Sequence, residues 1–264
     1  MDTLQAILLG IVQGITEFLP VSSSGHLQIA KALLGVEIEQ NLMFDVTLHA
    51  ATVLSTIVVL WREVARLLGG LFARRFNEEQ AYVLKLLLSM IPIGIVGFTL
   101  KERLDALLES PAILLVVGCM LLATAALLAF AYYAKPRQKA ELSYRDAFLI
   151  GVAQAAAALP GLSRSGTTIA TGLLLGNRKE TVAQFSFLMV LAPILGETFL
   201  ELMKGNLGAQ AIGTAPLAAG FIAAFVVGCL ACRFMIEIVK RGKLVWFAIY
   251  CAAAGVLSIG SYLF

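Results

Sequence analysis

The sequence predicts an all-α polytopic membrane protein with an inverted-topology repeat, comprising six full transmembrane helices and two re-entrant helical hairpins. Three observations support this prediction: the composition, the lengths of the apolar stretches and a duplicated polar motif. Of the 264 residues, 59% are hydrophobic and only 14% are charged, whereas soluble domains average about 45–50% apolar and about 25% charged residues. The mean hydropathy is +0.88, so we expect most of the surface to face lipid.

Six apolar stretches are long enough to cross a bilayer, since a spanning helix needs about 20 apolar residues. They cover residues 42–61, 81–100, 112–133, 181–203, 213–236 and 244–263.

Two further apolar stretches, residues 4–19 and 146–159, end at a proline that is followed by a polar run. A second short helical stretch follows each of them, near 27–34 and 168–175. A helix of ~15 residues rises only about 22 Å, which is too short for a ~30 Å hydrocarbon core. Each pair of short helices therefore predicts a re-entrant hairpin, whose irregular backbone is tolerated at membrane depth only inside protein or beside water.

The two hairpins are copies of each other at an offset of 141 residues. Three spans, an odd number, separate them, so the second hairpin must enter the membrane from the opposite face and the two polar tips can meet near the midplane. We predict a single membrane domain over 1–264, with repeats over about 1–134 and 142–264. The offset superposes Gly10 on Gly151, Gln13 on Gln154, Ser22 on Ser163, Ser24 on Ser165, and Gly25 on Gly166.

Charge predicts the orientation and limits the partners. Fifteen Lys and Arg residues fall on one predicted face and four on the other, so the rich face is expected to be cytoplasmic and both termini to lie outside. The net charge of +3 and the lack of a basic run argue against nucleic acid as a partner. Cys229 and Cys232 lie in an apolar run, so we interpret them as buried small side chains and not as a redox or metal pair.

The residues that could perform chemistry gather in the duplicated motif. Gln13 and Glu17 lie one helical turn apart and hence on one helix face, while His26 and Arg164 follow the two bends. Ionisable groups inside a membrane are costly and are usually functional. The alternative, a purely structural Glu17–Arg164 ion pair, would leave His26 and the hydroxyl groups without a role.

Together these groups suit a phosphate ligand. The planar guanidinium of Arg164 matches phosphate oxygens, and a carboxylate beside it can hold a divalent cation or act as a base. His26 could act as nucleophile, base or acid near neutral pH. The remaining predicted phosphate-binding residues offer hydroxyls, or backbone N–H groups where each bend enters its second helix: Ser22, Ser24, Gly25, Ser163, Ser165, Gly166 and Thr167.

The stretch QGITEFLPVSSSGH at residues 13–26, with PGLSRSGTT at 160–168, resembles the undecaprenyl-diphosphate phosphatase family linked to bacitracin resistance. The resemblance covers essentially the whole chain. It implies hydrolysis of undecaprenyl diphosphate to undecaprenyl phosphate and inorganic phosphate, which recycles the bacterial cell-wall lipid carrier. It also implies dependence on a divalent cation, Mg²⁺ or Ca²⁺, and an active site open to the periplasmic side of the bacterial cytoplasmic membrane.

By position, the resemblance implies that Glu17 is the second acid of the family's Glu/Gln-x-x-x-Glu motif and Arg164 the phosphate-binding arginine. Ser23 and His26 match the catalytic hydroxyl and imidazole. Gln13 fills a place held by Glu in some members; as a neutral amide it can help Glu17 ligate a metal or orient a group, but it cannot be a base.

Three other residues could extend the site. Asp45 and Glu197 lie near the outer ends of their predicted spans and could add negative charge at a metal site. A residue that simply touches interfacial water is the more economical interpretation of each. His49, one turn from Asp45, is interpreted as a hydrogen-bonded residue packed between helices.

Three mechanisms stay open from the sequence. Ser23 could attack the phosphorus with His26 as base and Glu17 orienting it, His26 could attack directly to form a phosphohistidine, or a metal-bound water could attack. In all three, Arg164 neutralises charge on the transferred phosphoryl group.

The main rival function is a polyprenyl-phosphate flippase or transporter, because inverted repeats with broken helices are a transporter architecture. Pure binding would not need the Glu17, Ser23 and His26 group, which favours the hydrolase. The oligomeric state is open: a small-residue face near residues 218–231 allows close packing within the bundle or in a homodimer.

Overall fold

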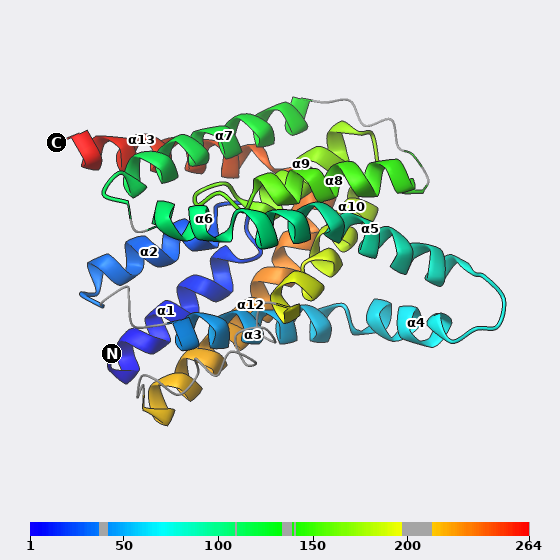
Figure 1. The fold of residues 1–264 in the computed structure, drawn as a ribbon, viewed down its shortest axis with the longest axis horizontal. Coiled ribbons are helices and arrows are strands. Elements are labelled where there is room, and N and C mark those ends of the chain that lie inside the picture. The colour runs from blue at the N-terminus through cyan, green and yellow to red at the C-terminus, as the bar shows by residue number, and fades with distance from the viewer. Residues whose placement is uncertain (37–41, 109, 134–138, 140, 197–212, 264) are drawn as a thin grey trace.

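The structure is a computed structural model that describes residues 1–36, 42–108, 110–133, 139, 141–196 and 213–263. These residues form α-helices and no β-strand. Figure 1 shows both termini at one end of the molecule, and the turn between α4 (Trp61–Leu71) and α5 (Glu78–Thr99) at the opposite end.

Four helices of the described part are long and apolar enough to cross a membrane. They are α5, α7 (Ile113–Tyr133), α12 (Thr214–Arg241) and α13 (Val245–Leu263). They match the spans predicted over 81–100, 112–133, 213–236 and 244–263. Only α12 is clearly longer than predicted, since it continues to Arg241. Lys240 and Arg241 in its last turn stabilise this extension, because cations are favoured at the negative end of the helix dipole. These helices make the chain a multi-pass membrane protein.

The two remaining predicted spans differ from the structure. The span predicted over 42–61 is a helix, α3 (Leu42–Val59), that breaks at Leu60 and bends by 81° into α4, so the pair is at most a fifth, bent span. Charged residues begin at Arg62, and Arg66 of α4 bonds Glu63 and Glu79 outside the apolar region. The span predicted over 181–203 begins with α10 (Lys179–Met189), and its residues 197–203 lie outside the described ranges.

The two predicted hairpins are pairs of short helices with a break at the polar motif. They are α1 (Thr3–Thr16) with α2 (Ser23–Leu33), and α8 (Tyr144–Ala156) with α9 (Arg164–Leu174). The second helix of each pair begins about four residues before the predicted start, since a serine caps it. The Ser22 hydroxyl accepts a hydrogen bond from the Gly25 N–H (3.5 Å), and Ser163 accepts one from Gly166 (3.1 Å). Most of each polar motif is thus the first helical turn and not a loop.

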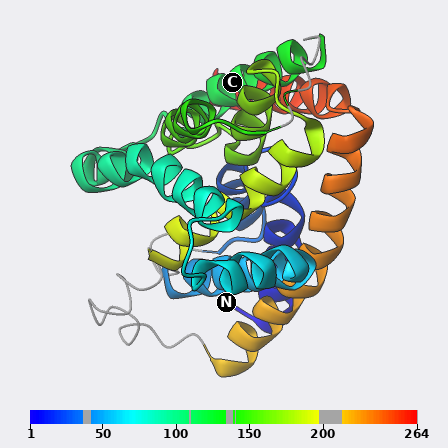
Figure 2. The same ribbon diagram turned by 90° about the vertical axis from the view of Figure 1, so that its right-hand side faces the viewer.

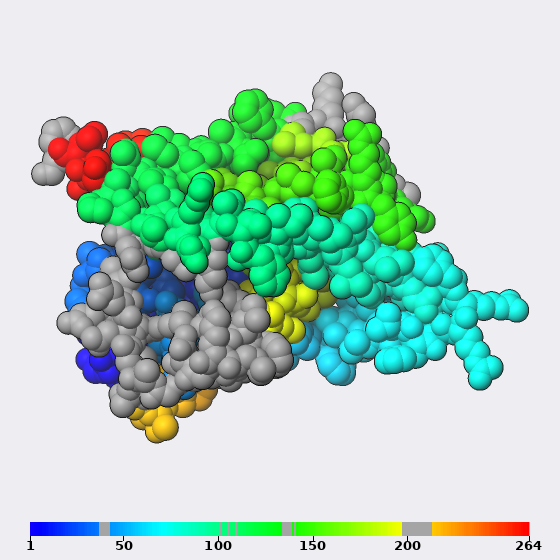
Figure 3. All heavy atoms as spheres, in the orientation of Figure 1, coloured from blue at the N-terminus to red at the C-terminus, as the bar shows by residue number. Residues whose placement is uncertain are grey.

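Each short first helix packs against a long helix from the other half of the sequence. α1 lies against α12, where a Cβ at Gly10 would collide with the carbonyl oxygen of Gly220. α8 lies against α5, where a Cβ at Gly151 would collide with the carbonyl oxygen of Ser89. Figure 2 shows α5 and α12 at opposite edges of the molecule, and α5 crosses the face shown in Figure 3. The small helix α6 (Lys101–Leu108) follows α5.

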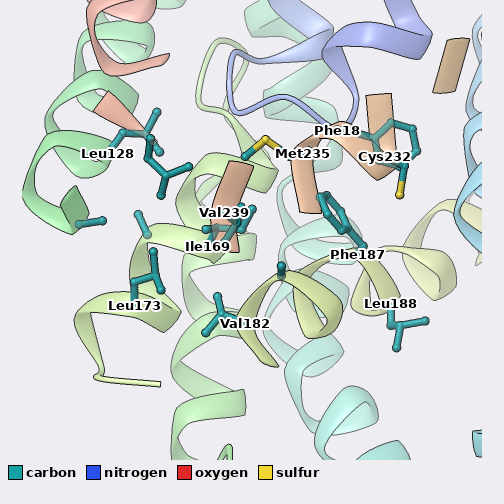
Figure 4. Packing of buried hydrophobic residues seen from close by; sticks show 14 of the residues in the cluster. Phe18, Leu128, Ile169, Leu173, Val182, Phe187, Leu188, Cys232, Met235 and Val239 are labelled. Atoms are coloured by element: carbon teal, nitrogen blue, oxygen red, sulfur yellow. The ribbon is translucent and has the colours of Figure 1, made fainter. Parts of the chain in front are cut away.

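The largest buried cluster joins the first motif to α10 and α12. The rings of Phe18 and Phe187 meet edge to face at 5.7 Å, beside Cys232 and Met235 (Figure 4). The small residues of α12 face inward within the chain: Gly220 lies against Phe44 of α3. This packing uses the small-residue face inside the bundle. Of the two cysteines interpreted as buried small side chains, Cys232 is buried and Cys229 is partly buried.

Candidate active site

The two polar tips touch. The hydroxyl of Ser165, on α9, donates a hydrogen bond to the carbonyl of Leu19 in the first bend (3.0 Å). A Cβ at Gly166 would lie 3.1 Å from the ring of Pro20, so glycine permits this close approach. The Cys251 thiol of α13 donates to the Pro20 carbonyl (3.3 Å) and holds the same bend from the other side.

Glu17 is the hub of the site. It forms an ion pair with the guanidinium of Arg164, as the sequence allowed. Its other oxygen, Oε2, accepts hydrogen bonds from the Ser23 hydroxyl (2.8 Å) and from Nε2 of Gln13 (3.0 Å). The Glu17 side chain is 6% exposed and that of Arg164 is 23% exposed. A carboxylate buried to this degree needs such partners, and both of its oxygens have them.

A cavity of about 350 Å³ opens beside this ion pair. Ligand cavities in proteins typically measure about 300–1,000 Å³. Its polar lining combines both motifs: Glu17, Ser22, Ser23, Ser24, His49, Gln154 and Arg164. Its apolar lining comes from α5, the bend between α8 and α9, and the region after α10: Ile93, Ala157, Ala158, Leu162, Val190, Pro193 and Ile194. One cavity therefore offers hydroxyls, a carboxylate and a guanidinium next to an apolar wall.

His26 lies outside the lining of this cavity. Its Nδ1–H donates to the carbonyl of Ser22 (2.8 Å), so the neutral ring accepts at Nε2 a hydrogen bond from the hydroxyl of Tyr250 (2.6 Å). The two rings also stack, with centroids 5.6 Å apart. In the described part of the chain, no hydrogen bond joins His26 to Ser23, which lies three residues earlier on α2, so their pairing as acid/base and nucleophile stays a prediction.

Tyr250 is a residue that the sequence analysis missed. Its only signal was a phenolic hydroxyl inside the apolar stretch 244–263, where a hydroxyl group surrounded by lipid or apolar side chains needs a hydrogen-bond partner. Nothing in the sequence indicated that the partner would be His26.

The predicted phosphate-binding residues divide into two groups. Ser22 and Ser24 line the cavity, with their hydroxyl oxygens 3.3 Å apart. The others lie outside its lining: Gly25, Ser163, Ser165, Gly166 and Thr167. In this structure the second motif mainly holds the fold together, as when the Ser163 backbone N–H donates to the Thr124 hydroxyl (3.0 Å).

His49 lies closer to the candidate active site than the sequence indicated. Its Nδ1–H donates to the Asp45 carbonyl (2.9 Å), as expected of a residue packed between helices, but the ring also lines the cavity that holds Glu17. Asp45 itself pairs with the buried ammonium of Lys31 (2.6 Å), which neutralises its charge. Glu197 lies outside the described residues.

A divalent cation would find few protein ligands here. Among the residues that the structure describes, no three His, Cys, Asp or Glu side chains come together. Gln13 Oε1, however, is buried beside Glu17 without a hydrogen-bond partner. Mg²⁺ commonly binds through one or two carboxylates, with substrate phosphates and water completing its shell. Glu17, which lines the cavity, and Gln13 Oε1, which is buried outside the cavity lining, are the two ligands on offer for such a cation.

The chain is similar to known proteins over nearly its whole length. A family model described as "Bacitracin resistance protein BacA" matches residues 6–257. Two relatives named undecaprenyl-diphosphatase, from Parabacteroides distasonis and Bacteroides fragilis, are 60% and 59% identical, over 98% of this chain and 98% of each relative. A more distant one with the same name, from Methanosphaera stadtmanae, is 35% identical over the same shares.

Proposed function

Since the chain belongs to the bacitracin resistance protein BacA family, we propose that it hydrolyses undecaprenyl diphosphate to undecaprenyl phosphate and inorganic phosphate. One observation carries the proposal: the Ser23 hydroxyl is hydrogen-bonded to Glu17, and Glu17 is paired with Arg164, in a single cavity. A binding protein would need the guanidinium but not a hydroxyl held against a carboxylate. The apolar wall of the cavity suits the prenyl chain.

Ser23 is the nucleophile in this proposal, and Glu17 is its base. The Ser23 oxygen attacks the terminal phosphorus while its proton passes to Glu17 Oε2, along the existing 2.8 Å hydrogen bond. The bond from that phosphorus to the bridging oxygen breaks, and undecaprenyl phosphate leaves. Arg164 stabilises the charge on the transferred phosphoryl group. Water then cleaves the phosphoserine, releasing phosphate and restoring the hydroxyl.

A bound Mg²⁺ or Ca²⁺ would be held by Glu17 and the unpaired Gln13 Oε1, together with oxygens of the diphosphate. It would neutralise part of the charge of the diphosphate. His26 has a supporting role: it bonds the Ser22 carbonyl and Tyr250, and so holds the first turn of α2, which carries Ser23.

The proposed membrane arrangement is an inverted repeat of six spans and two re-entrant hairpins. Its support is the correspondence between halves: serine caps at Ser22 and Ser163, and glycine contacts at Gly10 and Gly151 with spans of the opposite half. In the bacterial cytoplasmic membrane, the end with both termini faces outward and the arginine-rich α4–α5 turn faces the cytoplasm. As the family resemblance implies, the cavity is proposed to open toward the periplasm.

Phosphate release by the detergent-purified protein, from a C15 or C55 diphosphate with Mg²⁺ or Ca²⁺ and no gradient, tests the proposal. We expect turnover by the wild type and a loss of at least about a hundredfold in Arg164→Lys, which keeps a positive charge opposite Glu17 but lacks the planar fork. Ser261→Ala, on the exposed end of α13, is the matched control. A wild type that binds the lipid without releasing phosphate would support the transporter instead.

A further inference from the structure

Gln154 of α8 is a buried residue with an unpaired amide in the active-site cavity. The residue is 2% exposed, and neither Nε2 nor Oε1 has a hydrogen-bond partner among the described residues. It lines the same cavity as Glu17, Ser23 and Arg164. A buried polar group without a partner costs roughly 1–3 kcal/mol, a cost that a ligand could offset by supplying the missing partner.

The equivalent residue of the first half shows why this amide is free. Gln13 and Gln154 correspond at the 141-residue offset. Gln13 donates to Glu17, four residues later on the same helix face. Four residues after Gln154 stands Ala158, whose side chain can accept no hydrogen bond and which also lines the cavity. The second half therefore keeps the amide, lacks its internal acceptor, and leaves open space where that acceptor would be.

We propose that Gln154 binds the substrate, with its Nε2 donating to an oxygen of the diphosphate on the side opposite the first motif. The identity of the ligand rests on the proposed function. The observation that the Gln154 amide has no hydrogen-bond partner does not depend on it. A neutral donor suits this position, because it adds a hydrogen bond to the phosphate without competing with Arg164 for the charge of Glu17. The small side chains of Ala157 and Ala158 leave room for the phosphate next to it.

Gln154→Met tests the proposal, since it replaces the amide by an apolar chain of similar length. If the amide only contacts water, its removal should leave both stability and binding unchanged or slightly improved. If it binds the diphosphate, the KM for C15 diphosphate should rise roughly ten- to a hundredfold, as for one hydrogen bond to a charged group. Val152→Met, on the exposed opposite face of α8, is the matched control.

A second measurement separates this proposal from the proposed hydrolysis. Inorganic pyrophosphate should raise the Tm of the wild type and of Val152→Met more than that of Gln154→Met. If this difference in Tm is seen but the wild type releases no phosphate, the Gln154 binding site is supported and the proposed hydrolase function is contradicted. A KM and a pyrophosphate shift in Gln154→Met equal to those of Val152→Met would overturn the Gln154 proposal alone. If Gln154→Met does not fold, Gln154→Glu is used, and its added negative charge should weaken pyrophosphate binding at least as much.

Discussion

Ser22 has an unusual backbone for its residue type. Its φ of 71° is positive, and Ser22 is the one non-glycine residue with a positive φ in the described ranges. In the first bend, one residue separates Pro20 from the capping serine, whereas two separate Pro160 from Ser163. In the second bend, Gly161 takes the positive φ, at 92°. The first bend turns with one residue fewer, so the strained conformation, which costs ~1–3 kcal/mol, falls on Ser22.

Two substitutions at Ser22 should separate capping from strain. Ser22→Ala loses the cap, worth about 1 kcal/mol, and keeps the strain. Ser22→Gly loses the same hydroxyl but relieves the strain. We expect the Tm of Ser22→Gly in detergent to exceed that of Ser22→Ala, by a wider margin than separates the same pair at Ser163, whose φ is −67°. Equal margins at the two serines would show that Ser22 is unstrained.

The nucleophile can be identified at the same scale. Because the Ser23 hydroxyl donates to Glu17 in the cavity and His26 lies outside its lining, we expect a phosphoserine at Ser23. Rapid quenching with a diphosphate labelled in its terminal phosphate should trap an acid-stable, base-labile phosphoenzyme that is absent in Ser23→Ala. An acid-labile, base-stable adduct would assign the attack to His26.

At the scale of elements, the Lys31–Asp45 pair ties α2 to α3. The Lys31 side chain is 1% exposed, whereas that of Asp45 is 28% exposed. The two partners therefore depend on the ion pair to different degrees, because only the carboxylate can reach water when its partner is gone.

Breaking this pair should have unequal effects. Asp45→Asn leaves a buried ammonium without a countercharge and should cost about 3–5 kcal/mol of stability, more than Lys31→Met. The double variant should recover part of the loss. Thermal unfolding of all three in detergent measures this, and equal Tm losses for the two single variants would contradict the asymmetry of burial.

How far the sequence predicts these elements depends on the kind of signal. The limits of α5, α7 and α13 follow closely from the lengths of apolar runs. The starts of α2 and α9 could not be predicted in this way, because the residue type alone does not show whether a serine caps a helix or lies in a loop. The Glu17–Arg164 pair was foreseeable, since two buried opposite charges need each other. The Tyr250–His26 contact joins residues 224 positions apart and has no local signature.

At the scale of the whole molecule, glycine sets how closely the halves pack. At Gly10 and Gly151 a Cβ would strike backbone of α12 and α5, and backbone cannot move as a flexible side chain can. Gly94 and Gly97 of α5 have nothing within 4 Å of a built Cβ. Adding a Cβ should therefore lower stability at the packed glycines, Gly10 and Gly151, and not at the open ones, Gly94 and Gly97.

Alanine at each position should show this difference. Gly10→Ala and Gly151→Ala should each destabilise by about 1–3 kcal/mol through overpacking. Gly94→Ala and Gly97→Ala should stabilise the protein by up to about 1 kcal/mol, since alanine has a higher helix propensity than glycine and nothing crowds these positions. The Tm of each variant, compared with the wild type in the same detergent, measures these effects. An unchanged Tm in Gly10→Ala would mean that α1 does not pack tightly against α12.

The seating of α1 on α12 also has a consequence for biosynthesis. The ribosome completes α1 long before it reaches α12, and at ordinary elongation rates the intervening chain takes roughly 10–40 s to make. For most of that interval Glu17 lacks Arg164, and for all of it α1 lacks its neighbouring helix, so the first hairpin is made well before its carboxyl group gains a countercharge. The active site is thus assembled last, and a nascent chain that stops before α12 holds every proposed catalytic residue without the helix that seats the first of them.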